Sequence, residues 1–494
     1  MSPLSFVNSD LKQKADQLMD ELWSGGVNIP TTSIEQVSYL MFLKSLTEMD
    51  EKHAELARKA GGKHKMIFSN SWAKYSWRTV SRLSGDELYN TLVEVFEKFQ
   101  ELPNLSEMGK ILFRQAHLKI YSRPTLKSVV SIIDGMDYNN PQKYDTDVKG
   151  DLYEYLLSKI NTSGTNGQFR TPRHIIDFMV RLTQPQPGDY ILDPACGTAG
   201  FLIQAYKYIL EKNTSKEELK SGHKTGDKLR PAQHNFLKEQ ALNGYDNDGE
   251  MIKFAIMNLY LHGLESANVR HFDPLCWQND KDRKYDIVLA NPPFSGSIKK
   301  EAILEDINLN TTATELLFVK YMADHLGPEG KAAIVVPEGL LFGSTGAHLK
   351  LRKSLVEEFN ILGVISMPAG VFRPYAGVKT SAIIFSRTKP QMKIWFYELQ
   401  SDGFSLNENR EPISENDIPD LLSRWNDKSE SENSWAIDTK FIKENNYILT
   451  AANYKPHKIE AMEYGDPKKL IDNLIDIEKE ITEGLRNIKS KINK

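Results

Sequence analysis

The residues of this chain best suited to chemistry are Asn291, Pro292, Pro293 and Phe294, which follow an apolar run at 285–290. This run has the length of a strand buried on both faces, and two successive prolines exclude strand pairing and helix alike. Because a residue before proline favours an extended backbone, Asn291 projects its amide from the carboxyl end of the strand, where open α/β sheets bind ligands. The amide oxygen, the next carbonyl and the aromatic face fit a planar base with an exocyclic amino group, extruded from its duplex stack. The simpler alternative is a turn whose prolines only end the strand.

Earlier in the chain, the segment 189–203 is typical of a strand, a glycine turn and a helix. Its glycines let the backbone pass close to a ligand, and the free N–H groups of the helix that starts near 199–201 can face a carboxylate. The dinucleotide spacing G-x-G-x-x-G is absent, which favours S-adenosylmethionine, a nucleoside with a carboxylate and an ammonium group. The residues of this turn expected to bind it are Asp193, Ala195, Gly197, Gly200 and Phe201.

Two later strand ends carry aspartates that could complete the nucleoside site. Asp246 could accept both ribose hydroxyls, as an acidic residue does in dinucleotide folds, but at a longer spacing here. The charged, polar segment 211–231 accounts for the extra length and is expected to be a solvated loop. Asp273, with Phe272 beside it, could accept the amino group of the cofactor adenine. Taken singly, either aspartate is more often a loop cap or a surface residue.

With these motifs in this order, the chain resembles the modification subunits of type I restriction–modification systems, which are adenine-specific DNA methyltransferases of the gamma motif order. Segments 167–172, 315–318, 330–342 and 370–381 resemble further family segments, so the similarity is specific over roughly 149–387. The first of these corresponds to the segment that closes over the cofactor in the family, which implies contacts from Phe169 and Thr171. Arg170 stands where relatives often have an aromatic residue, and this puts that one contact in doubt.

The resemblance implies methyl transfer from S-adenosylmethionine to the exocyclic amino group of an adenine flipped out of double-stranded DNA. It also implies a separate specificity subunit bound by two copies of this chain, and a motor-nuclease subunit that joins for restriction. In this reading, Asn291 and the Pro292 carbonyl accept the two N–H groups of the amine, and Phe294 stacks on the base. Neither a metal nor a strong base is required.

Three alternatives stay open at this point. A protein-glutamine methyltransferase would use the same Asn-Pro-Pro-aromatic corner, but such enzymes are much shorter. Cytosine-amino methyltransferases usually have Ser or Asp where Asn291 stands. A non-catalytic scaffold that binds cofactor only to hold its fold is disfavoured by the intact corner. The chain lacks a G-x-x-x-x-G-K-[ST] phosphate loop, so ATP hydrolysis is not expected.

Composition is typical of a large globular protein, with 494 residues, 26% charged and 40% hydrophobic. Two cysteines cannot form a disulfide framework, and no signal peptide or membrane span is recognisable, so we expect a soluble cytoplasmic protein without a membrane partner. The net charge of −4 means that DNA affinity must come from local patches or another subunit. Candidate phosphate contacts near the corner are Lys299, Lys300, Arg373 and Lys379.

Elements on both sides of these motifs must position them. Helical periodicity predicts an all-helical N-terminal part with Trp72 and Trp77 buried, and a capping box from Thr32 to Glu35. The predicted helices are 11–23, 32–57, 88–99, 105–120, 125–133 and 151–160.

Alternating strands and helices then predict an α/β fold, a Rossmann-like S-adenosylmethionine-dependent methyltransferase sheet that is mostly parallel. Its later strands are expected at 332–336, 362–367, 380–385 and 393–397. The segments 378–385 and 392–396 are expected to pair as the reversed edge strands.

The C-terminal part is expected to serve assembly. Residues 399–447 are acidic and polar, with no surface suited to reading base edges, so sequence specificity is delegated. Residues 470–492 predict an amphipathic helix with one apolar seam, for which docking to another subunit is favoured over packing on the parent domain. The expected domains are helical 1–148, catalytic 149–400, irregular 401–458 and docking helix 459–494.

Overall fold

The computed structural model describes residues 9–138, 148–160, 171–278, 283–307, 309–374, 376–456 and 467–492. The chain divides into two compact units, Met1–Tyr454 and Lys455–Lys494. In the described part of the chain, no helix is both long and apolar enough to cross a bilayer.

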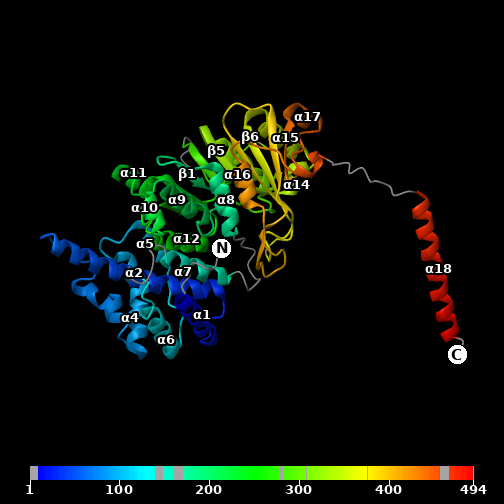
Figure 1. Ribbon diagram of the computed structural model, residues 1–494. Helices are drawn as coiled ribbons and strands as arrows, with labels where there is room; N and C mark the ends of the chain where they lie inside the picture. The colour runs from blue at the N-terminus through cyan, green and yellow to red at the C-terminus, as the bar shows by residue number, and fades with distance from the viewer. Residues whose placement is uncertain are drawn as a thin grey trace. The chain divides into compact units, whose positions relative to one another are not determined.

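The N-terminal part is helical, as predicted, and its helices gather beside α7 and α12 (Figure 1). Its longest helix, α2, is apolar around most of its middle, so it is buried on several sides by the others. The rings of Phe42 and Tyr39 of α2 pack against that of Phe113, with centroids 5.7 and 5.1 Å away. The helices are α1 (Ser9–Ser24), α2 (Pro30–Lys59), α3 (Trp77–Val80), α4 (Gly85–Lys98), α5 (Glu107–Leu112) and α6 (Arg123–Asp134).

Two details of this part differ from the prediction. The helix expected at 105–120 is confined to 107–112, because the chain turns at Phe113. The predicted capping box from Thr32 to Glu35 is wrong, because α2 begins at Pro30 and Thr32 therefore lies inside the helix. Proline suits the first position of a helix. Trp77 is buried, as expected, whereas Trp72 is half-buried.

The helical part is fixed to the rest of the unit through α7 (Val148–Ser158) and α12 (Gly249–Leu261). Phe42 of α2 lies against Tyr260 of α12, with ring centroids 4.5 Å apart. Lys253 of α12 donates to the Tyr39 hydroxyl at 2.9 Å. Since both parts belong to one compact unit, the domain boundary at 148/149 stays a prediction.

Among the described residues, nine strands form one sheet in the order β11-β8-β6-β7-β5-β4-β1-β2-β3. The neighbouring strands β5 and β4, β4 and β1, β1 and β2, and β2 and β3 pair in parallel, and so do β6 and β8. The strands are β1 (Ile191–Asp193), β2 (Leu242–Asp246), β3 (Asn268–His271), β4 (Tyr285–Ala290), β5 (Leu326–Pro337), β6 (Asn360–Met367), β7 (Thr380–Ser386), β8 (Lys393–Glu398) and β11 (Ser434–Asp438).

The mostly parallel sheet with a reversed strand is confirmed, but the expected pairing of 378–385 with 392–396 is wrong. Strand β7 lies inside the sheet, antiparallel to both β5 and β6. All seven of its residues are buried, which suits an interior strand. The edge strand that runs antiparallel to its neighbour is β11, which pairs with β8.

Helices cover both faces of the sheet, as in a doubly wound α/β fold (Figure 1). One apolar core holds residues of α8 (Arg173–Thr183), α9 (Gly200–Lys212) and α12. The other holds residues of α13 (Thr314–His325) and α15 (Gly346–Glu358). Strands therefore carry apolar side chains on both faces, with Ile191 in the first core and Leu192 in the second.

Two segments are more ordered than their composition suggested. The expected solvated loop 211–231 contains a short helix, α10 (Lys216–Lys220). The expectation of irregular structure for 401–458 is wrong for most of that segment, because its few apolar residues, such as Trp435, complete the main sheet and its cores. It contains β9 (Asp402–Phe404), β10 (Pro412–Asn416), α16 (Ile418–Arg424), β11 and α17 (Thr439–Glu444).

The second unit contains α18 (Pro467–Ile492), close to the predicted helix 470–492. The apolar residues described in it are all exposed, by 44–65%. They are Ile471, Leu474, Ile475, Ile477, Ile481, Leu485 and Ile488. Within its own unit this helix therefore leaves its apolar face uncovered.

Candidate functional site

The carboxyl ends of three neighbouring strands carry the polar residues expected at the site. Strand β1 lies between β2 and β4 in the sheet. Asp193 ends β1, Asp246 ends β2, and Asn291 directly follows β4. Parallel neighbours with ligand-facing side chains at one edge are the arrangement in which open α/β sheets bind ligands.

The turn after β1 is held by hydrogen bonds from its backbone amides to the carboxylates that end β1 and β2. Gly197 (φ 51°) and Ala199 (φ 65°) adopt the left-handed conformation, and α9 begins immediately afterwards. The Gly197 amide donates to Asp246 Oδ2 at 2.9 Å, and the Ala195 amide donates to Asp193 Oδ1 at 3.1 Å. Apart from its two chain neighbours, no described residue has an atom within 4 Å of the position that a Gly197 Cβ would occupy. The turn therefore presents bare backbone toward open space.

Asp193 and Asp246 are carboxylates in an unfavourable environment for negative charge. Burial raises the pKa of Asp193 well above its usual range, and the nearby charge of Asp246 acts in the same direction. Burial also raises the pKa of Asp246, against the hydrogen bonds from the Asp248 and Gly197 amides. A cationic ligand beside them would favour their ionised forms.

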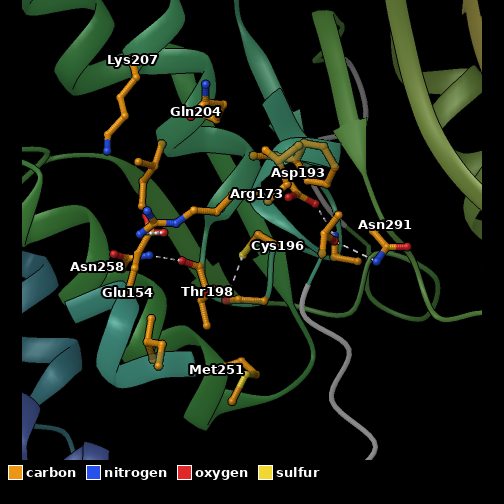
Figure 2. Close-up of a pocket in the computed structure, with 18 of the residues that line it drawn as sticks. Glu154, Arg173, Asp193, Cys196, Thr198, Gln204, Lys207, Met251, Asn258 and Asn291 are labelled. Atoms are coloured by element: carbon orange, nitrogen blue, oxygen red, sulfur yellow. Dashed lines mark hydrogen bonds and ion pairs between the residues drawn. The ribbon is translucent and has the colours of Figure 1, made fainter. Parts of the chain in front are cut away.

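A pocket lies around this turn (Figure 2). It brings together seven of the predicted site residues, which come from the start of α8, the β1 turn, the start of α9 and the corner after β4. They are Thr171, Asp193, Ala195, Gly197, Gly200, Phe201 and Asn291. Three separate sequence motifs thus meet at one cavity.

Asn291 joins the corner to the start of α8. Its Nδ2 donates to Thr171 Oγ1 at 2.9 Å. Its Oδ1 is buried and accepts no hydrogen bond from any residue that the structure describes. A buried carbonyl oxygen without a donor costs about 1–3 kcal/mol, which a ligand N–H would offset.

The rest of the corner consists of two prolines and Phe294. The Phe294 ring meets the Phe372 ring edge to face, with centroids 5.3 Å apart and an interplanar angle of 84°. Pro292 is buried and Pro293 is exposed. Phe372 comes from the 370–381 segment, which was singled out in the sequence without a role for this residue.

Other predicted residues do not line the pocket. Phe272 packs its ring against Tyr245, with centroids 5.1 Å apart, and Asp273 accepts from the Leu275 amide at 3.0 Å, as a loop cap does. Asp246 does not line the pocket, but its side chain accepts from the amide of Gly197, which does. Phe169 lies outside the described residues.

Of the four expected phosphate contacts, one is paired with an acidic residue and three are exposed, so their role stays a prediction. Lys379 forms an ion pair with Glu338 at 3.2 Å. Lys299, Lys300 and Arg373 are exposed.

Sequence reasoning missed a charged group on the opposite side of the pocket, where α7, α8 and α9 meet (Figure 2). Arg173 forms an ion pair with Glu154 and lies 3.5 Å from Asp151. Lys207 lies 3.7 Å from the same aspartate. The sequence feature that could have pointed to this charged group is Arg173, which directly follows Thr171-Pro172 and occupies the first position of α8.

Two family descriptions match this chain. N-6 DNA Methylase matches residues 144–462, and HsdM N-terminal domain matches residues 11–159. The first match contains every site residue described above, and the second covers most of the helical N-terminal part, together with α7.

Individual relatives agree with these matches. The methylase subunit of the type I restriction enzyme EcoEI from Escherichia coli is 28% identical over 94% of this chain and 93% of its own length. A chain from a structural study of complex assembly in a type I R-M system is 26% identical, with a TM-score of 0.72 and 98% of both chains covered. The fold is also that of a modification subunit of a putative type I restriction enzyme from Vibrio vulnificus YJ016, with 24% identity, a TM-score of 0.72, and 92% of this chain and 99% of that one covered.

Proposed function

We infer that this chain, which belongs to the N-6 DNA methylase family, is a DNA adenine methyltransferase that serves as the modification subunit of a type I restriction–modification complex. It methylates the exocyclic amino group of adenine at specific sites. The family assignment leaves the glutamine and cytosine-amino alternatives without support of their own. The intact corner from Asn291 to Phe294 argues against a scaffold role.

S-adenosylmethionine is the methyl donor that fits this pocket, and when bound it supplies an electrophilic methyl group on a positively charged sulfur. Asp193 and Asp246 are buried carboxylates that become less costly to ionise when a cation faces them. The first turn of α9 offers free N–H groups to a carboxylate. Thr171 borders the same cavity, and Phe169 stays a predicted contact.

The observation that carries the proposal is the Oδ1 of Asn291, which accepts from no described residue, while Asn291 itself lines the pocket that contains the glycine turn. We propose that this oxygen accepts one N–H of the adenine amine and that the Pro292 carbonyl accepts the other. Two fixed acceptors favour a tetrahedral nitrogen, whose lone pair is released from the ring for attack on the methyl group. Preorganised dipoles of this kind also stabilise the positive charge that the nitrogen gains.

Phe294 and Phe372 form the aromatic surface beside these acceptors. Stacking on an aromatic side chain is worth about 1–3 kcal/mol per base, and this offsets part of the cost of extruding the adenine from its duplex. We propose that Phe294 stacks on the extruded base and that Phe372 holds Phe294 in place from its edge.

The test is transfer of labelled methyl groups from S-adenosylmethionine to DNA, with and without a co-expressed specificity subunit. We expect methylation of adenine only when both subunits are present. Incorporation into cytosine, or none with either preparation, would refute the proposed activity. Site-specific methylation by this chain alone would refute delegated recognition.

We propose that helix α18 contacts the specificity subunit. We also propose that each specificity subunit binds two copies of this chain. The exposed apolar residues of α18 recur at an eleven-residue period, because Leu474 precedes Leu485 and Ile477 precedes Ile488 by that number of positions. An eleven-residue repeat keeps one seam along a nearly straight or slightly right-handed helix pair. We propose that the specificity subunit supplies a helix that fits this seam. The motor-nuclease subunit is expected to join this assembly for restriction.

A further inference from the structure

A buried carboxylate, Asp402, lies at the start of β9, outside the site described above. Its side chain is fully buried. Its Oδ2 is 2.8 Å from His174 Nε2 and also accepts from Arg410 Nη2. Burial opposes its ionisation, but the hydrogen bond from His174 and the charge of Arg410 hold the pKa of Asp402 below its usual range. Asp402 therefore joins two cationic or hydrogen-bonding side chains from separate elements.

His174 brings this cluster to the cofactor pocket. It is the second residue of α8, next to Arg173, which lines the pocket. Thr171, three residues earlier, lines the pocket as well and accepts from Asn291. Strand β9 pairs with β10 in antiparallel orientation, and the two form a hairpin. The His174 ring is stacked on Phe404 of this β9–β10 hairpin, with centroids 4.5 Å apart and an interplanar angle of 24°. The start of α8 is thus held to the β9–β10 hairpin by a hydrogen bond and a ring stack.

The other side of the hairpin reaches the aromatic wall of the site. The Leu406 carbonyl is 3.0 Å from the position that a Gly370 Cβ would occupy, so the hairpin packs directly on the backbone of the 370–372 loop. That loop carries Phe372, which meets Phe294 edge to face. One hairpin therefore contacts both the start of α8, beside the proposed cofactor pocket, and the loop that carries Phe372 beside the proposed base site.

We propose that Asp402 is a positioning residue for methyl transfer, which fixes the start of α8 against the β9–β10 hairpin before cofactor binds. This rests on the proposed function, because the pocket that α8 closes is the proposed S-adenosylmethionine site. The side chain of Asp402 does not line the pocket, so it acts through His174. A preformed pocket binds more tightly because binding does not have to order its wall.

The cost of this arrangement supports a role beyond packing. Asp402 Oδ1 has no hydrogen-bond partner among the residues described, although the carboxylate is fully buried. An apolar residue would avoid that desolvation cost, and buried charges are kept in several proteins because they specify one arrangement. Here the arrangement specified is the contact between α8 and the hairpin.

The hairpin contains a matched control. Asp417 anchors the same open end of the hairpin, directly after Asn416, which pairs with Asp402. Its Oδ2 accepts from the Gln400 and Ser401 amides at 2.7 and 2.9 Å, and its side chain forms no hydrogen bond with the described residues of α8. We would measure the Kd of S-adenosylmethionine by calorimetry, its KM in DNA methylation by the full complex, and the Tm of each chain. The variants are Asp402→Ala, Asp402→Asn, His174→Ala and Asp417→Ala.

We expect Asp402→Ala to raise the Kd and KM of the cofactor about tenfold, whereas kcat at saturating cofactor changes less than about threefold, because bound cofactor itself then orders the start of α8. Asp402→Asn should retain part of the affinity, and Asp417→Ala should lower Tm without changing Kd. The double variant of His174 and Asp402 should resemble Asp402→Ala alone, since the two act as one unit.

Unchanged Kd in His174→Ala and Asp402→Asn would overturn the proposal, and these two variants settle it even if Asp402→Ala does not fold. An equal rise in Kd for Asp417→Ala would also overturn it, because the effect would then come from a loosened hairpin. A wild-type chain that binds no S-adenosylmethionine would instead refute the proposed function.

Discussion

Asn291 Nδ2 and Thr171 Oγ1 are 2.9 Å apart, and this hydrogen bond joins the corner that ends β4 to the residue that precedes α8 by two positions. Because Nδ2 is engaged by Thr171, the amide oxygen is the atom of Asn291 left to accept from a ligand. Thr171, which lines the pocket, therefore also sets the orientation of the proposed amine acceptor.

The first prediction separates these two roles. Asn291→Ala removes the acceptor and should abolish adenine methylation by the complex, while S-adenosylmethionine still binds with near-normal Kd. Thr171→Val keeps the volume of the side chain but removes the acceptor for Nδ2, so we expect a fall in kcat of roughly tenfold from misorientation. Methylation assays and calorimetry check both. Near-normal turnover by the alanine variant would contradict the assigned role.

The second prediction concerns pH and Asp193. Burial raises the pKa of this carboxyl above its unfolded value, so the stability it contributes is present at low pH and is lost as pH rises through the folded-state pKa. Asp193→Asn stays neutral at every pH and can still accept from the Ala195 amide. The cofactor-free variant should therefore be more stable than the wild type above that pKa, and this advantage should vanish in acid.

The same substitution should weaken cofactor binding about tenfold or more, because it removes a negative charge that faces a cationic ligand. Urea unfolding across the pH range and calorimetry at neutral pH give the two measurements. Equal stability at all pH values would show that Asp193 is not held in an unfavourable environment.

Much of this site was predictable because its signals are local. The apolar run and the two prolines correctly predicted the limits of β4, 285–290, and the glycine turn correctly predicted where α9 begins. The pairing of Arg173 with Glu154 was not predictable, because it depends on α7 packing beside α8. Strand β11 was missed for a similar reason: Trp435 is apolar in a polar segment and becomes buried only when the sheet provides a neighbour.

The third prediction tests how closely α7 is packed on α12. A Cβ at Gly150 would come within 2.1 Å of the His262 ring, a buried side chain whose Nδ1 donates to the Asn258 carbonyl at 2.7 Å. Gly150→Ala should destabilise the chain by about 1–3 kcal/mol through overpacking, despite the better helix propensity of alanine. Gly249→Ala is the control, since the position of its Cβ has no described neighbour within 4 Å. Chemical unfolding should rank the two variants, and equal stability would contradict close packing here.

The fourth prediction concerns Lys44, a buried lysine of α2. Its Nζ donates to the carbonyls of Ile133, Asp134 and Met136 at 2.9, 3.0 and 2.7 Å, where α6 ends. Lys44→Met leaves these acceptors without their charged donor and should cost about 1.5–3 kcal/mol of unfolding free energy.

Lys14→Met is its matched control. Lys14 donates to the neighbouring Gly135 carbonyl at 2.9 Å, but its side chain is 31% exposed, so water can replace it. We expect a loss below about 1 kcal/mol for this variant. A loss as large as that of Lys44→Met would mean that burial does not decide the strength of these contacts.

The last prediction tests α18 as the docking helix. Replacing Ile477, Ile481 and Leu485 together by Gln removes the centre of the exposed seam but keeps good helix formers. We expect the variant to lose co-purification with the specificity subunit, because the buried apolar area of the helix pair is lost. Its Tm should not change, since these side chains are already exposed in the free chain.

The matched control changes the charged residues between them. Glu480 and Glu483 replaced together by Gln should leave co-purification intact, because these residues lie outside the apolar seam. Size-exclusion chromatography of the chain alone identifies a competing partner: if the seam pairs with a second copy, the wild type elutes as a dimer and the apolar variant as a monomer. That outcome, or unchanged co-purification by the apolar variant, would exclude the specificity subunit as the occupant of this seam.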